Sequence, residues 1–190
     1  MTRLLRTLRA ERGYSLIEML TVLVIMGVVM TSLTTVFVQA SNAELDMNNR
    51  FQAQQEARLA LDKMRREVHC GQIATPAGQS SSVTITLPNY CKTGSGSITW
   101  CTRNVSTNRY ALYRIVGSTC TGGVKWADYL VPTSTAPVCS SALCIFTYTA
   151  QSTSSLAKLH VDYPVNVKPA KSVELYELID DIVLRNSSRS

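Results

Sequence analysis

One carboxylate stands at the edge of a long apolar segment. Glu18 follows Leu16 and Ile17, and the next twenty residues, Met19 to Val38, carry no formal charge. A helix of about 20 residues spans the hydrocarbon core of a bilayer. A carboxylate beside such a segment is costly wherever lipid replaces water, and it becomes tolerable when a fixed cation sits next to it. The chemistry expected of Glu18 is therefore ion pairing.

The residues before Glu18 resemble the type IV prepilin (class III) signal. Gly13 is followed by an aromatic residue, a small polar residue, two aliphatic residues and Glu18. The preceding leader is short and basic, with Arg3, Arg6, Arg9 and Arg12 against the single acid Glu11. The resemblance implies that prepilin peptidase cleaves between Gly13 and Tyr14 on the cytoplasmic face and then methylates the new amine of Tyr14.

The same resemblance gives Glu18 a partner. Glu18 would be the fifth residue of the mature chain, where pilins keep the carboxylate that pairs with the terminal amine of a neighbouring subunit. Most family members have Phe where this chain has Tyr14, which is a mild departure. Residues 50–68 also look like minor pilins and pseudopilins of the PilW/PulJ kind. The resemblance covers roughly the first third of the chain.

Three other interpretations of the apolar segment account for fewer of its features. An ordinary secretory signal peptide would use Val38-Gln39-Ala40 as its cleavage site, but the apolar part of such peptides is about 7–15 residues long. A plain single-span anchor leaves Glu18 without a role. A buried helix of a cytosolic protein is disfavoured by the long uncharged run and by the cysteine usage. The prepilin interpretation accounts for all of these features.

The charge of the chain indicates topology rather than a polyanionic partner. The net charge is +6, but residues 1–13 hold four of the 19 bases and one of the 13 acids, which leaves +3 for the rest. That excess is too small to indicate nucleic-acid binding. Basic residues beside a span stay cytoplasmic, so the C-terminus is expected outside the cytoplasmic membrane.

The six cysteines all follow the apolar segment, in the part of the chain expected to be exported. Thiols outside the cytoplasm form disulfides, so three bridges are predicted. Cys139 and Cys144 bracket a short loop and are expected to pair with each other.

The other four cysteines allow two arrangements. If a hairpin is centred near Val105, Cys91 lies opposite Cys120, which favours that pair and leaves Cys70 for Cys101. The alternative joins Cys70 to Cys91 and Cys101 to Cys120, and it stays open at this point.

No metal, cofactor or catalytic site is predicted. There is no Cys-x-x-Cys pair, and His69 and His160 lie far apart in the sequence. An acidic group near the C-terminus lacks the spacing of a calcium loop and is expected at a solvated edge; it comprises Glu174, Glu177, Asp180 and Asp181.

The elements that position these residues follow an α+β pattern. One helix is expected over residues 15–70, with a transmembrane half and an amphipathic half, ending near Gly71. Its apolar stripe is predicted to comprise Phe51, Ala57, Ala60 or Leu61, Met64 and Val68. Strands are expected at 82–87, 98–103, 110–116, 125–131, 144–149, 156–167 and 173–185, with Pro164 at an edge or bulge.

These elements predict a pilin-like chain: leader 1–13, transmembrane or filament-core helix 14–40, amphipathic helix 41–70, and an extracytoplasmic disulfide-bonded β-domain 71–190 packed on that helix. The resemblance implies a minor pilin or pseudopilin of a type IV pilus, competence pilus or type II secretion pseudopilus, with prepilin peptidase and other pilin subunits as partners. It would sit in the cytoplasmic membrane and then in the filament. The alternative is a membrane-anchored extracellular binding or adhesion module.

Overall fold

The computed structural model describes residues 14–171 and 174–187. Helix α1 (Leu16–Cys70) contains 55 residues and contributes to two compact units, one ending at Met47 and the other beginning at Asn48. Every described residue up to Ala40 is exposed. Within the described residues, α1 is the one helix long and apolar enough to cross a membrane. Gly13 and the rest of the leader lie outside the described part of the chain.

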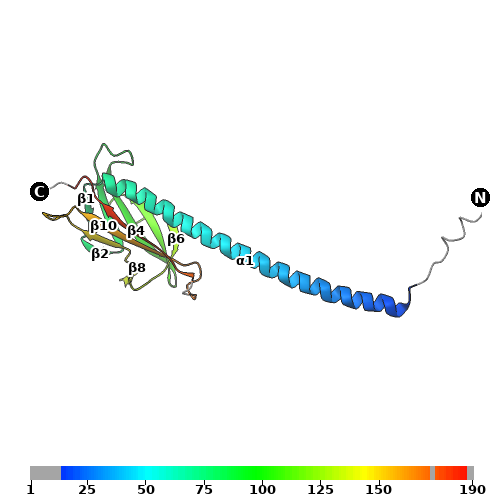
Figure 1. The fold of residues 1–190 in the computed structure, drawn as a ribbon. Helices are drawn as coiled ribbons and strands as arrows, with labels where there is room; N and C mark the ends of the chain where they lie inside the picture. Colours follow the sequence, from blue (N-terminus) through cyan, green and yellow to red (C-terminus); the bar gives the residue numbers. More distant parts are fainter. Residues whose placement is uncertain (1–13, 172–173, 188–190) are drawn as a thin grey trace, which may run out of the picture. The chain divides into compact units, whose positions relative to one another are not determined.

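The unit from Asn48 onward combines the second half of α1 with an antiparallel sheet, which confirms the α+β layout (Figure 1). Its strands are β1 (Ile73–Thr75), β2 (Gly78–Ser80), β3 (Ser82–Leu87), β4 (Gly96–Ser106), β5 (Arg109–Val116), β6 (Val124–Leu130), β7 (Val138–Cys139), β8 (Ala142–Leu143), β9 (Phe146–Thr149), β10 (Lys158–Val165) and β11 (Tyr176–Val183). The order in the main sheet is β1-β3-β4-β5-β6-β10-β9-β2, with β11 paired to β10. Strands β7 and β8 form a separate small hairpin. The short strands β1, β2, β7 and β8 were not predicted, since two or three residues carry no readable alternation.

The helix packs against the sheet through small and medium-sized apolar side chains. Its buried stripe comprises Ala53, Ala57, Ala60, Leu61, Met64 and Val68. Phe51 was predicted to begin this stripe, but its side chain is 57% exposed. Phe51 lies about 200° around the helix from Ala53, so the two residues cannot share the buried face.

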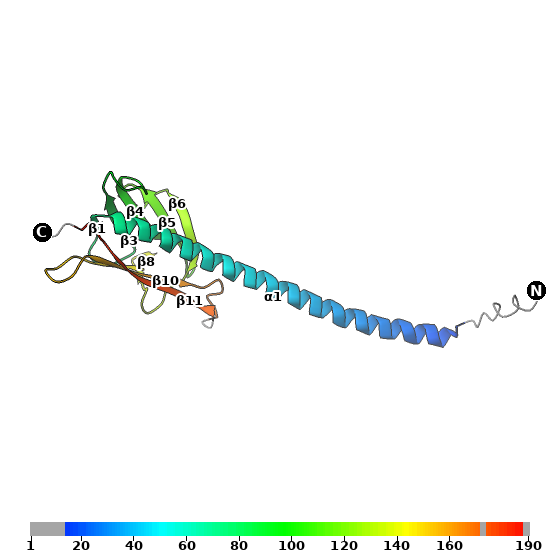
Figure 2. The same cartoon turned by 45° about the horizontal axis from the view of Figure 1, so that its top comes forward.

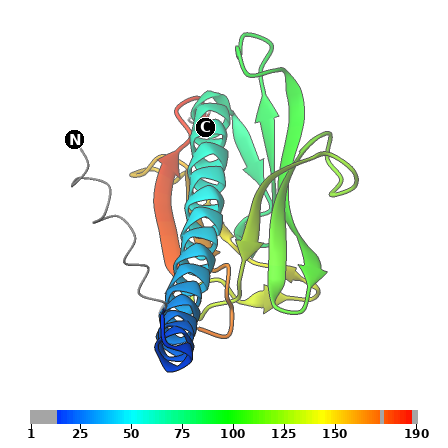
Figure 3. The same cartoon turned by 90° about the vertical axis from the view of Figure 1, so that its right-hand side faces the viewer.

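Strands β11 and β3–β6 flank the second half of α1. In the view along the helix, β11 (red) lies on one side and β3–β6 (green) on the other (Figure 3). The turned view of Figure 2 shows the same arrangement, with β10 beside β11. Contacts from α1 therefore reach both limbs of the sheet, including the hydroxyl of Tyr163 in β10, which lies 3.4 Å from Met64 Sδ.

The helix ends where the sequence predicted. Gly71 donates its N–H to the carbonyl of Glu67 at 2.8 Å and to that of Val68 at 3.1 Å. A Cβ at Gly71 would come within 2.5 Å of the Ile85 side chain. The glycine thus allows the chain to leave the helix while remaining against β3.

The β4–β5 hairpin turns later than predicted. Cys101 is paired with Tyr113, and the turn lies at residues 107–108, where Asn108 adopts φ 55°. Cys91 and Cys120 lie outside the paired residues, in the loops before β4 and after β5, so the hairpin does not bring them together. The disulfides are Cys70–Cys91 and Cys101–Cys120, so the preference for Cys91–Cys120 was wrong.

Pro164 lies in an interior strand, contrary to the edge or bulge position predicted for it. Strand β10 is paired with β11 along one side, while its other side pairs first with β9 and then with β6. The carbonyl of Pro164 accepts a hydrogen bond from Val131 N on the β6 side. Its nitrogen faces the same side, between the β9 and β6 pairings, so the missing N–H removes no ladder bond.

Candidate functional site

The N-terminal turn of α1 positions Glu18. The backbone N–H groups of Glu18 and Met19 donate to the carbonyl of Ser15 at 2.9 and 3.2 Å, which starts the helix. Glu18 is the third helical residue, and its carboxylate lies near the positive end of the helix dipole. The spacing Ser15-x-x-Glu18 is also that of a capping box. Tyr14 lies just before the helix and is 76% exposed.

The polar side chains beyond Glu18 are compatible with lipid. Between Leu16 and Ala40 the helix contains five hydroxyl side chains, and each donates to a backbone carbonyl three or four residues earlier, at 2.7–2.9 Å; they belong to Thr21, Thr31, Ser32, Thr34 and Thr35. In hydrocarbon an unsatisfied hydroxyl is costly, and these bonds remove that cost. From Met19 to Val38 the helix surface therefore carries no charge and its hydroxyl groups are hydrogen-bonded, with the carboxylate of Glu18 at the start.

A buried carboxylate fixes the other half of the helix to the sheet. Glu67 has no exposed surface. Its Oε1 accepts from Arg114 Nε at 2.8 Å, and its Oε2 accepts from Trp100 Nε1 at 2.8 Å. Lys63 Nζ lies 3.4 Å from Oε1. Because both oxygens have strong donors, the charge is compensated and ties α1 to β4 and β5.

Glu67 was not predicted to be buried or to link α1 to the sheet. A signal was present: Glu67 falls three residues after Met64 and seven after Ala60, on the apolar stripe rather than on the polar face. A charged residue in that position needs a partner. Its partner Arg114 could not be identified without the tertiary structure, because the two residues are 47 positions apart.

Polar contacts also join α1 to the last strand, β11. Arg50 pairs at 2.6 Å with Glu174, which lies two residues before β11, and Arg65 pairs at 2.7 Å with Asp180 in β11. The distance between His69 Nδ1 and the carbonyl oxygen of Val183 is 2.9 Å. The residue numbers of the partners increase together along α1 and along β11, so the two elements run parallel. The contacts are spread along the length of β11.

The predicted acidic group does not form one site. Asp180 faces α1, whereas Asp181 faces the other side of β11, where it contacts His160 at 2.7 Å and Lys158 at 3.1 Å. Alternate residues of a strand point to opposite faces, which separates the two carboxylates. Among the residues that the structure describes, no group of three or more His, Cys, Asp or Glu side chains is arranged to hold a metal ion.

Asp128 is the centre of a second charged cluster, on β6. Its carboxylate accepts two hydrogen bonds from Arg109, at 2.9 and 2.8 Å, and one from Lys125 at 2.8 Å. The backbone N–H of Tyr129, which has φ 60°, also donates to it at 2.7 Å. Burial raises the pKa of Asp128, but the hydrogen bonds outweigh burial and lower this pKa to about 2.

Three disulfides reinforce this unit. Cys70–Cys91 links the end of α1 to the loop after β3, and Cys101–Cys120 links β4 to the loop after β5. Cys139–Cys144 closes the β7–β8 hairpin. Within the described ranges no cysteine is free.

Residues 8–34 match the prokaryotic N-terminal methylation motif, the segment that contains Gly13, Tyr14 and Glu18. This match and the long apolar helix fit a type IV prepilin-like protein. No curated protein and no solved structure matches the chain. The methylation motif implies processing by prepilin peptidase and assembly with other pilins, and the apolar helix fits a membrane anchor.

Proposed function

We propose that the chain is a minor pilin or pseudopilin, a structural and non-catalytic subunit of a type IV pilus, a competence pilus or a type II secretion pseudopilus. Prepilin peptidase removes residues 1–13 by cleavage between Gly13 and Tyr14, and the new amine of Tyr14 is methylated. The remaining chain stays in the cytoplasmic membrane with its C-terminus outside, until α1 enters a filament.

The observation that carries this proposal is the surface of α1 from Leu16 to Ala40. Its residues are exposed, those from Met19 to Val38 carry no charge, and Glu18 lies in its first turn, within the residues that match the methylation motif. In a filament, the carboxylate of Glu18 pairs with the terminal amine of a neighbouring subunit. That ion pair compensates the charge when both groups leave water.

One face of this segment supports helix–helix packing. Gly27, Thr31 and Thr35 follow one another at intervals of four residues and line a shallow groove together with Val24, Val28 and Ser32. Small residues at this spacing let two helices approach closely in an apolar environment. The domain division 14–40, 41–70 and 71–190 assigns filament packing to the first segment, anchorage of the sheet to the second, and display outside to the third.

Processing provides the direct test. Co-expression with a prepilin peptidase should yield a mature protein that begins at N-methyl-Tyr14, which N-terminal sequencing and intact mass spectrometry detect. Gly13→Phe should leave the leader in place, because cleavage requires a small residue there. A mature chain beginning at Ser41 would show that an ordinary signal peptidase acts instead.

A further inference from the structure

A groove opens on the unit that begins at Asn48, where the start of β3, the second half of β4 and the β7–β8 hairpin come together. Its volume is about 350 Å³, within the range of small-molecule sites, about 300–1,000 Å³. Six of its nine lining residues carry a hydroxyl, amide or guanidinium group: Ser81, Ser82, Thr102, Arg103, Asn104 and Ser141. None of the nine carries a carboxylate, so the lining can donate hydrogen bonds to an anion without repelling it.

The part of the chain that forms this groove is poor in acids. Between Glu67 and Asp162 the sequence has one acid, Asp128, and six Lys or Arg residues. Four of the six pair with a carboxylate; they are Arg109, Arg114, Lys125 and Lys158. Within the described residues, no carboxylate lies at ion-pair distance from the other two, Lys92 and Arg103. Of these two, only Arg103 lines the groove.

Uncharged groups hold the guanidinium of Arg103 in place. Its Cζ lies 4.1 Å from the centre of the Tyr113 ring, and its Nη2 donates to the carbonyl of Gly122. An arginine stacked on an aromatic ring has less conformational freedom to lose when its N–H groups bind a carboxylate. Arg103 is thus a positioned cation without an anion of its own.

The walls of the groove are fixed before any ligand binds. Thr102 donates its backbone N–H to the Ser81 carbonyl at 3.0 Å and its hydroxyl to the Leu143 carbonyl at 2.6 Å, which joins the β3 side to the β8 side. Two of the three disulfides fix the other walls, one in the loop after β5 and one in the β7–β8 hairpin. A site that keeps its shape when empty loses little conformational entropy on binding.

Four further polar side chains of the lining are available to a ligand. In the part of the chain that the structure describes, they form no hydrogen bond; they are Ser81, Ser82, Asn104 and Ser141. Hydroxyl and amide groups both donate and accept, so they suit the hydroxyl groups of a ligand. The remaining lining residues, Cys101, Cys120 and Ala142, are apolar and suit the C–H face of a sugar ring.

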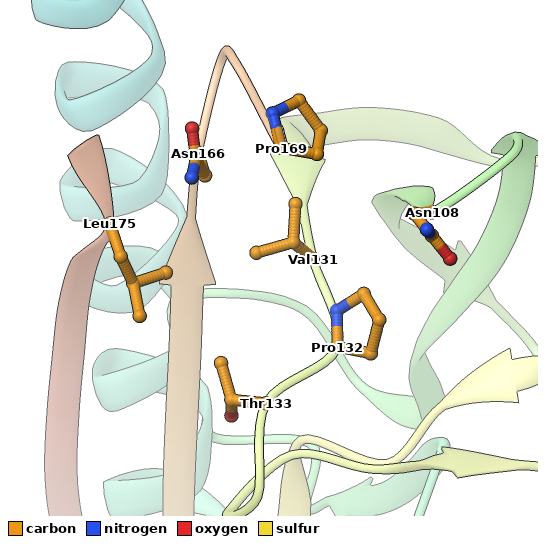
Figure 4. Close-up of a pocket in the computed structure, with 7 residues that line it drawn as sticks. All are labelled: Asn108, Val131, Pro132, Thr133, Asn166, Pro169 and Leu175. Atoms are coloured by element: carbon orange, nitrogen blue, oxygen red, sulfur yellow. The ribbon is translucent and has the colours of Figure 1, made fainter. Parts of the chain in front are cut away.

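The pocket in Figure 4 does not share these features. Its volume is about 170 Å³, and its lining contains two prolines and no charged side chain. The side chains of Leu175 and Val131 are directed toward one another across it (Figure 4). No anion is expected to bind there.

We propose that the groove lined by Arg103 binds an acidic saccharide, with the carboxylate of the ligand on Arg103 and its ring hydroxyls on the serines and Asn104. A nucleic acid fits this lining less well, because the lining has one cation and no aromatic side chain on which bases could stack. The inference goes beyond the proposed structural role, since the groove can bind its ligand whether or not the chain enters a filament.

Titration of the detergent-solubilised full chain tests the proposal. Trigalacturonate and sialyllactose represent two classes of acidic saccharide, and lactose is the neutral counterpart of sialyllactose. By isothermal titration calorimetry, one of the two acidic saccharides should bind about tenfold or more tightly than lactose, because a hydrogen bond to a charged group is lost in the neutral ligand. Which of the two binds identifies the class. Equal binding of lactose, or no binding of either acidic saccharide, would overturn the proposal.

Two pairs of variants locate the site. Arg103→Gln and Lys92→Gln each remove one positive charge that has no carboxylate partner within the described residues. Arg103→Gln should weaken binding of the acidic saccharide about tenfold or more, whereas Lys92→Gln should change it by less than about twofold. Ser141→Trp fills the groove without changing its charge and should abolish binding. Leu175→Trp fills the pocket of Figure 4 and should leave binding unchanged.

The outcomes are separable from those of the filament proposal. Thiol alkylation first establishes that each variant has formed its disulfides. Equal losses in Arg103→Gln and Lys92→Gln would show that binding depends on net charge alone, and unchanged binding in Ser141→Trp would place it elsewhere; either result overturns the inference. So does a short single-stranded DNA that binds more tightly than both saccharides. The filament proposal is tested by cleavage and by recovery in filaments, and none of these results affects it.

Discussion

The two halves of α1 have the same backbone conformation, but each carries a carboxylate in a different situation. The carboxylate in the first half lacks a partner from its own chain, and the one in the second half has several. Between Leu16 and Ala40 every side chain is exposed, and the carboxylate of Glu18 has no ion-pair partner within the described residues. Between Ala53 and Cys70 the buried Glu67 has Arg114, Trp100 and Lys63 as partners from its own chain. The first half is therefore incomplete by itself, whereas the second is satisfied within one subunit. Exposed apolar surface on this scale requires lipid or other helices.

The largest expected effect is at Glu18. Glu18→Ala should abolish incorporation into filaments, because the terminal amine of a neighbouring subunit loses its partner, while cleavage after Gly13 continues. Cleavage and recovery in sheared filaments are measured in the same strain. Glu44→Ala removes an exposed acid later in the helix and should assemble normally. Assembly of Glu18→Ala at the wild-type level would remove the difference between the two halves.

At Glu67 the expected effect is on folding rather than on assembly. Glu67→Ala leaves Arg114 and the Trp100 N–H without their acceptor in a buried site, which should cost about 3–5 kcal/mol of the free energy of unfolding. Denaturant unfolding of the detergent-solubilised chain, followed by tryptophan fluorescence, gives the value. The matched control Glu56→Ala, at an exposed position of the same helix, should change stability by less than about 0.5 kcal/mol. Equal effects at positions 56 and 67 would contradict the anchoring role.

The Cys70–Cys91 disulfide should contribute slightly less to the free energy of unfolding than Glu67 does. The double substitution Cys70→Ser and Cys91→Ser opens a loop of 21 residues, and closing a loop of that size is worth roughly 3 kcal/mol. Unfolding is compared with and without reductant. Removing Cys139 and Cys144 instead, which are separated by 5 residues, should cost less because the loop is shorter. A larger loss from the shorter loop would indicate that the end of α1 is held by packing alone.

The smallest effect is expected at Asp128, and it depends on pH. Asp128→Asn should lower the free energy of unfolding at neutral pH by about 1.5–3 kcal/mol, the range for hydrogen bonds to charged groups. Folding lowers the pKa of Asp128 from 3.8 to about 2, so its contribution is complete above the higher value and is lost as the pH falls through the lower one. Unfolding curves of both proteins should therefore converge near pH 2. A difference that stays constant down to that pH would show that the charge is not responsible.

The features that depend on local sequence pattern could be predicted without a structure. Three local patterns predicted the helix, its end and the α+β class: the uncharged run after Glu18, the amphipathic continuation to Cys70 and the alternation in residues 82–87. Helix and strand periodicities can be recognised from residues that are close together in the sequence. The methylation motif was likewise readable, since a peptidase recognises a short contiguous segment. The assembly role of Glu18 follows from the same segment and stays a prediction.

Contacts between residues far apart in the sequence could not be predicted from local pattern. The turn at residues 107–108 set the β4–β5 register, because the pairing of two strands depends on where the chain reverses. Cys91 and Cys120 lie in loops outside these strands, so the paths of the loops decided the cysteine pairing. The exposure of Phe51, the partners of Glu67 and the separation of Asp180 from Asp181 depend on which face each element turns to the others. Such choices are made by packing between elements far apart in sequence, and no local pattern contains them.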